Sequence, residues 1–148
     1  MEADMVYHER FAWSGLITSV VTMVAYVVLV LRDAAGGPLE QVDWLPLMLW
    51  TIGGGIVLSI VLTIAWGLIG SRGDRESAMA SDIRDRDISQ LGGRVEQGFV
   101  TIAGLGVIAL CAVGADVFWI ANTMFAGFAI AAFVGGIARV VAYRRGLV

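Results

Sequence analysis

Hydrophobic positions along the chain form four long runs that contain no charged residue. The runs cover residues 11–31, 44–70, 98–115 and 117–138. Each run is close to or longer than the ~18–20 apolar residues that a helix needs to cross ~30 Å of hydrocarbon. The pattern therefore predicts an all-α integral membrane protein, with four transmembrane helices bundled in a single membrane domain over residues 1–148.

Capping residues mark where two of these helices begin. Asp43 precedes the second run, which has Pro46 in its first turn, and Asp116 precedes the fourth run. A carboxylate at such a position accepts hydrogen bonds from free backbone N–H groups and meets the positive end of the helix dipole. With Gly114 two residues before it, Asp116 predicts a tight turn between the third and fourth helices.

The polar segment 71–97 separates the second run from the third. Its densest part runs from Asp82 to Asp87, where acids and arginines alternate at spacings that stabilise an exposed helix by ~0.2–0.5 kcal/mol per pair. Apolar residues then continue at helical spacing into the third run. The third helix is therefore expected to extend into the cytoplasm. Gly92, Gly93 and Gly98 predict a bend near the membrane surface.

The distribution of arginine predicts the orientation. All ten basic residues are arginines; five lie in segment 71–97 and none lies around Asp116. Cytoplasmic loops are enriched in basic residues, so both termini and segment 71–97 are expected in the cytoplasm. The first apolar run is too long for a cleavable signal peptide, and 58% hydrophobic residues exclude an ordinary water-soluble domain. The protein is thus expected to be multi-pass in the cytoplasmic (inner) membrane.

Small residues recur at intervals of four on the second helix, which permits close approach of another helix. They form a helix-packing interface made of Gly55, Ser59, Thr63 and Gly67. Gly127, Ala131 and Gly135 repeat this spacing on the fourth helix. Such a face packs either against a second copy, giving a homo-oligomer, or against a neighbouring helix of the same chain.

Few polar residues lie inside the apolar runs. Asn122 and Thr123 are the candidates for an ion or substrate pathway, a role that competes with ordinary hydrogen bonding between helices. Arg139 is near enough to the inner surface to reach lipid headgroups. Cys111 is the single cysteine and is interpreted as a packing residue.

No catalytic constellation, cofactor motif or metal site is evident. The carboxylates of Asp82, Asp85 and Asp87 would have to bind a metal ion in competition with neighbouring arginines. The same acids neutralise the basic stretch, so nucleic-acid binding is not expected. The expected partners are the lipid bilayer, a second copy and a cytoplasmic protein. The predicted partner-binding residues are Asp82, Arg84, Asp85, Arg86 and Asp87, which would otherwise be a solvated charged face.

Three segments carry a resemblance to a known family: residues 45–54, residues 82–99 with an Asp-x-Arg-Asp-Arg-x-Ile core, and residues 118–146. Together they resemble a family of small bacterial four-helix membrane proteins known only as a domain of unknown function. Family members typically have Asp-Glu-Arg-Asp-Arg, and Ile83 replaces the second acid here. The resemblance implies a regulatory pairing with a small helix-turn-helix protein, and it brings no catalytic residues.

The expected function is therefore non-enzymatic, a regulatory or scaffolding role through the charged cytoplasmic segment. The alternative is a small oligomeric channel or transporter, whose pathway would pass the small-residue faces and Asn122.

Overall fold

Each predicted apolar run is a helix in the computed structural model, which describes residues 2–70 and 78–145, with side chains over 13–65 and 86–144. The elements are α1 (Glu2–Ala34), the short 3-10 helix η1 (Leu39–Gln41), α2 (Trp44–Gly70), α3 (Ala78–Ala112) and α4 (Val117–Arg145). All four α-helices contain a segment long and apolar enough to cross a membrane. The prediction of an all-α bundle of four transmembrane helices is confirmed.

The helix ends differ from the apolar runs where charged residues continue a helix. α2 matches the expected range, but α1 begins at Glu2 and α4 ends at Arg145. Acids near a helix start and arginines near its end interact favourably with the helix dipole, so both helices extend past the apolar span. The third helix does extend before its apolar run, since α3 begins at Ala78. α3 stays one continuous helix through its three glycines in segment 92–98. Because a continuous helix can still curve, the expected bend stays a prediction.

The α3–α4 turn is built as predicted. Gly114 adopts a positive φ of 70°, and its N–H bonds to the carbonyl of Cys111 at 3.1 Å, which is the geometry of a glycine C-cap. The carboxylate of Asp116 then accepts a hydrogen bond from the N–H of Phe118 at 2.8 Å and caps α4. The turn therefore fixes an antiparallel α3–α4 hairpin.

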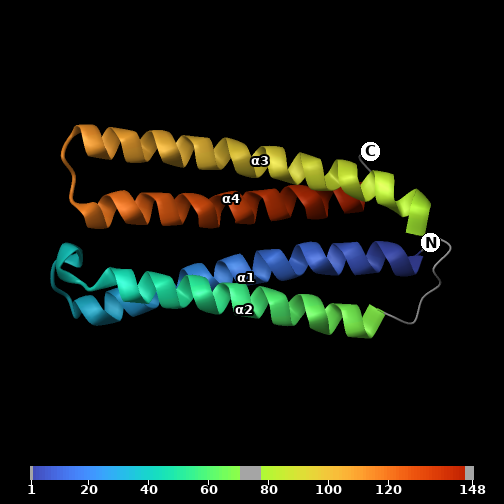
Figure 1. The fold of residues 1–148 in the computed structure, drawn as a ribbon, viewed down its shortest axis with the longest axis horizontal. Helices are drawn as coiled ribbons and strands as arrows, with labels where there is room; N and C mark the ends of the chain where they lie inside the picture. Colours follow the sequence, from blue (N-terminus) through green and yellow to red (C-terminus); the bar gives the residue numbers. More distant parts are fainter. Residues whose placement is uncertain (1, 71–77, 146–148) are drawn as a thin grey trace.

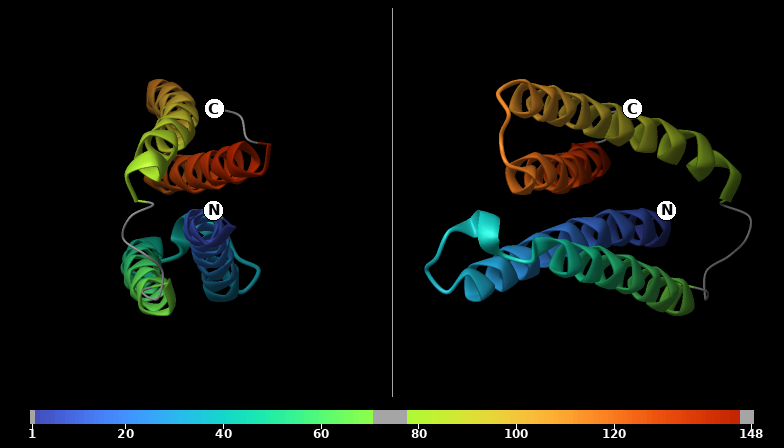
Figure 2. Two further views of the ribbon diagram at one scale, coloured as in Figure 1. Left: turned by 90° about the vertical axis from the view of Figure 1, so that its right-hand side faces the viewer. Right: turned by 60° about the vertical axis from the view of Figure 1, so that its left-hand side comes forward.

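The helices pack in the spatial order α2–α1–α4–α3. α1 packs against both α2 and α4, and α4 packs against α3, whereas α2 and α3 share no extended contact in the described part of the chain (Figures 1 and 2). We call the end with the α1–α2 loop and the α3–α4 turn the hairpin end. The opposite end, where α1 begins and α4 ends, is the terminal end. The bundle is thus open along the side between α2 and α3.

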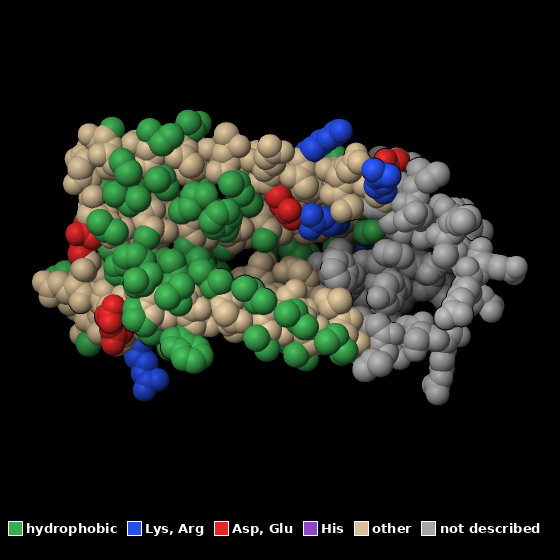
Figure 3. All heavy atoms as spheres, viewed as in Figure 1, with side chains coloured by type: hydrophobic (Ala, Val, Ile, Leu, Met, Phe, Trp, Pro, Cys, Tyr) green, Lys and Arg blue, Asp and Glu red, His purple; other side chains and the backbone are tan. Residues whose placement is uncertain are grey.

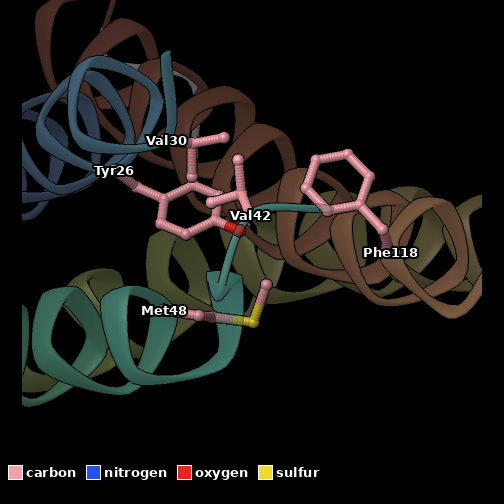
Figure 4. Close-up of a cluster of buried hydrophobic side chains, with 5 residues drawn as sticks. All are labelled: Tyr26, Val30, Val42, Met48 and Phe118. Carbon is pink, nitrogen blue, oxygen red and sulfur yellow. The ribbon is translucent and has the colours of Figure 1, made fainter. Parts of the chain in front are cut away.

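An apolar cluster closes the hairpin end. Its buried members come from α1, the α1–α2 loop, α2 and α4, and are Tyr26, Val30, Val42, Met48 and Phe118 (Figure 4). The Tyr26 ring meets the ring of Phe125 edge-on, with centroids 4.7 Å apart. Because Val42 belongs to the loop, the loop itself is part of the core at this end.

Candidate functional site

The first turns of α3 project beyond the helix against which α3 packs. Gly106 lies against the methyl group of Thr123, and Gly92 lies under the side chain of Arg139. This antiparallel register brings the end of α4 level with residues near 86, so residues 78–85 continue past α4 (Figure 1). α3 has 35 residues and is ~52 Å long at ~1.5 Å per residue, whereas the hydrocarbon core of a membrane is only ~30 Å thick.

The charged run sits at the base of this projection. Arg86 and Asp87 are exposed, and Ile88 directly after them is fully buried, at 0% exposure. The side chains of Asp82, Arg84 and Asp85 lie outside the described ones, although their backbone is helical. Ser89 and Gln90, which follow Ile88, are exposed again, so at this level α3 packs through one side and leaves the other side open.

An ion pair joins α3 to α4 four residues after Gly92. The Arg139 guanidinium lies 2.8 Å from the carboxylate of Glu96, and both side chains are about 30% exposed. A Cβ at Gly92 would overlap Arg139, and one at Gly135 would overlap Glu96, so each charged side chain crosses bare backbone of the facing helix. The register of the two helices thus gives Arg139 an acidic partner at its own depth, and its contact with lipid headgroups stays a prediction.

The small residues of α4 pack within the chain. A Cβ at Gly127 would overlap Ala103 of α3, and Ala131 is 2% exposed. On α2, Gly55 lies against Thr22 of α1. The first residue of the predicted small-residue face of α2 therefore packs within the protomer. The rest of that face is Ser59 and Thr63, both exposed, and Gly67, whose surroundings lie outside the described side chains.

The two candidate pathway residues face different helices. The hydroxyl of Tyr26 donates to Oδ1 of Asn122 at 2.8 Å, and Nδ2 of Asn122 donates to the carbonyl of Phe118 at 2.8 Å. Thr123 instead turns its methyl group toward α3. Asn122 thus links α1 to α4 through a hydrogen bond, and the two residues do not line a common path.

Sequence reasoning missed a row of polar residues on α1. Ser14, Thr18, Thr22 and Tyr26 are four residues apart in the first apolar run, a spacing that could have revealed a shared face. Oγ1 of Thr18 is buried and has no hydrogen-bond partner among the described residues. By contrast, the hydroxyls of Thr51 and Thr63 donate to carbonyls of their own helix.

A polar contact also fastens the loop at the hairpin end. The indole N–H of Trp119 donates to Oε1 of Glu40 at 2.8 Å. A hydrogen bond from its own backbone and then the bond from Trp119 lower the pKa of Glu40 from its ordinary value. Both bonds favour the ionised carboxylate, so the loop is held to α4 by a charge-assisted hydrogen bond.

Metal-ligating side chains do not gather in the described part of the chain: no three His, Cys, Asp or Glu residues there could hold an ion together. Cys111 is exposed near the hairpin end.

No family model matches the chain, and comparisons with curated proteins and with solved structures found no match either.

Proposed function

We propose that this integral membrane protein is not an enzyme and acts as a regulator or scaffold, binding a cytoplasmic protein through the charged run Asp82–Asp87 of α3. We also propose that it belongs to the bacterial four-helix family that its Asp-x-Arg-Asp-Arg-x-Ile motif resembles. The arginine distribution supports an inner-membrane location with both termini and the run in the cytoplasm.

The projection of α3 beyond α4 is the observation that carries the proposal. A mixed-charge run on a continuous helix presents a fixed pattern of charges, and such a pattern selects partners by electrostatic complementarity. The same helix continues through the Glu96–Arg139 ion pair to the hairpin end. A partner held at the run is therefore attached to a rigid element that spans the membrane.

Reversing every charge in the run tests the docking role. The variant combines Asp82→Arg, Arg84→Asp, Asp85→Arg, Arg86→Asp and Asp87→Arg. It keeps the helix-spaced pairs and inverts the pattern that a partner meets. We expect normal insertion and thermal stability, with loss of the proteins that wild type captures from native membranes and cytosol.

The matched control replaces the same five residues with Gln, which removes both the pattern and the helix support. If wild type and the charge-reversed variant capture the same proteins in equal amounts, the run is a solvated face and the docking proposal is wrong.

Self-association is a separate part of the proposal. Outside the apolar cluster at the hairpin end, α2 packs mainly against α1. Its exposed Thr63 lies on a face of small residues that a second copy could approach closely. Light scattering in detergent should give the mass of an oligomer, and Thr63→Leu should shift it toward the protomer. Val61→Leu, at an exposed apolar position of α2, is the control. A protomer mass for wild type would contradict self-association.

The rival function, a small channel or transporter, receives less support. Asn122 is occupied by Tyr26 and by its own helix, and the apolar cluster closes the hairpin end. Selective ion flux through the purified protein in liposomes would favour this rival over the docking role.

A further inference from the structure

The row of polar residues on α1 has no part in the proposed docking function. Ser14 and Tyr26 are 7% and 3% exposed, and Oγ1 of Thr18 between them is also buried. Residues four apart on a helix lie on one face. Thr18 and Thr22 as whole residues are half-buried, so the row lies along the side of α1 that faces the protein.

The contact between α1 and α2 shows what lies opposite this row. A Cβ built on Gly55 would come within 2.8 Å of Oγ1 of Thr22, so the two helices touch at this level. They run antiparallel, and one turn toward the terminal end Thr18 is level with Ser59, which is exposed. We call these four residues, Thr18 and Thr22 of α1 with Gly55 and Ser59 of α2, the polar seam.

The seam is closed toward the hairpin end. The next polar residue of the row, Tyr26, is bonded to Asn122 and belongs to the apolar cluster. On α2, the hydroxyl of Thr51 is 2.9 Å from the carbonyl of Met48 and donates to it. Both groups are thus satisfied within the protein, and the cluster around them leaves no polar path onward.

At Thr18 the situation is the opposite. Its buried hydroxyl has no partner among the described residues, and lipid tails cannot supply one. Buried polar atoms of this kind are commonly satisfied by water, which needs about two to four polar neighbours. In Figure 3 the surface is hollowed between α2 and the α3–α4 pair.

We propose that the polar seam is a hydrated crevice: water enters from the terminal end, reaches the hydroxyl of Thr18 and stops before the Tyr26–Asn122 hydrogen bond. The seam contains hydroxyls and a glycine but no charged group, so its chemistry suits water rather than an ion. The inference rests on the α1–α2 contact and is independent of the charged run on α3.

Cysteine accessibility tests the crevice, because a thiol reacts with methanethiosulfonates as the thiolate, which forms in water and not in lipid. In a Cys111→Ser background, Thr18→Cys and Ser59→Cys are the seam variants. Ile60→Cys, next along α2 and 53% exposed on its apolar surface, is the lipid-facing control. Thr51→Cys lies beyond the closure. From the terminal end, we expect both seam variants to react at least about tenfold faster than Ile60→Cys, and Thr51→Cys to stay unreacted.

Reaction of Thr18→Cys at the rate of Ile60→Cys would overturn the proposal, whether or not Ser59→Cys reacts. Fast reaction of Thr51→Cys would also overturn it, since the crevice would then continue past the closure. Thr18→Val provides a second measurement that needs no reagent. It should lower the thermal midpoint if water satisfies the hydroxyl, and an unchanged or raised midpoint would mean that the seam is dry.

Discussion

At the residue scale, glycines decide how closely α3 and α4 approach. Because Gly127 has no side chain, Ala103 fits against it, and Glu96 fits against Gly135 for the same reason. Helices in lipid gain little from the hydrophobic effect when they associate, so close packing and polar contacts must hold them together. In this hairpin the glycines allow the close packing, and the Glu96–Arg139 ion pair provides a polar contact.

Gly127→Ala should destabilise the protein by about 1–3 kcal/mol, because the added Cβ meets Ala103 and the helices must separate. Thermal or denaturant unfolding in detergent measures the change. Gly104→Ala is the matched control: nothing lies within 4 Å of its added Cβ, so it should stabilise the helix by up to about 1 kcal/mol. Equal effects of the two substitutions would contradict the assigned packing.

Residue-scale contacts between helices were the least predictable from the sequence. Asn122 was recognised as a polar residue inside an apolar run, but its partner Tyr26 lies on another helix. Arg139 was recognised as an arginine close to the inner surface, but its partner Glu96 lies on another helix. Both contacts depend on the register of two helices, which hydropathy does not encode.

At the element scale, each helix could be predicted from its apolar run, and the turn between α3 and α4 could be predicted from its capping residues. Asp116 caps α4 and Gly114 ends α3 as their residue types imply. The α1–α2 loop carries no comparable signal in the sequence. Its role in closing the hairpin end comes from Val42, a single apolar residue whose burial needs α1, α2 and α4 in place.

The Glu40–Trp119 hydrogen bond should make the hold of this loop pH-dependent. The pKa of Glu40 in the folded protein is lowered from 4.5. The stability that its carboxylate contributes is therefore fully present above the pKa of the unfolded chain, and it is lost as the pH falls through the lower pKa of the folded state. We expect the thermal midpoint of wild type to exceed that of Glu40→Gln at neutral pH and the difference to shrink below pH 4.5. A difference that stays constant down to acid pH would rule out this role for the carboxylate.

At the scale of the whole molecule, the number of spans followed from the sequence, whereas the spatial order of the helices did not. The order α2–α1–α4–α3 leaves α2 and α3 with one extensive partner each. Hydropathy measures how apolar a segment is, and lipid and protein neighbours both satisfy an apolar face. The separation of α2 from α3 therefore became visible only in the folded chain (Figure 2).

The orientation of the whole molecule can be measured directly. Five arginines lie in segment 71–97 and none around Asp116, so a reporter fused after Val148 should be active only in the cytoplasm. A second fusion, inserted after Gly114 in the α3–α4 turn, should show the opposite activity. A periplasmic C-terminus would place the charged run on the wrong side for a cytoplasmic partner.

The central claim is that the projecting part of α3 binds a protein, and crosslinking from that helix in living cells tests it most directly. A photo-reactive amino acid replaces the exposed Asp87, and a control places it at Ile102, an exposed apolar position of the same helix. We expect a protein adduct from position 87 that is absent from position 102. This adduct should disappear when the charges of Asp82, Arg84, Asp85 and Arg86 are reversed. The claim is contradicted if position 87 yields no protein adduct, or yields one that survives the charge reversal.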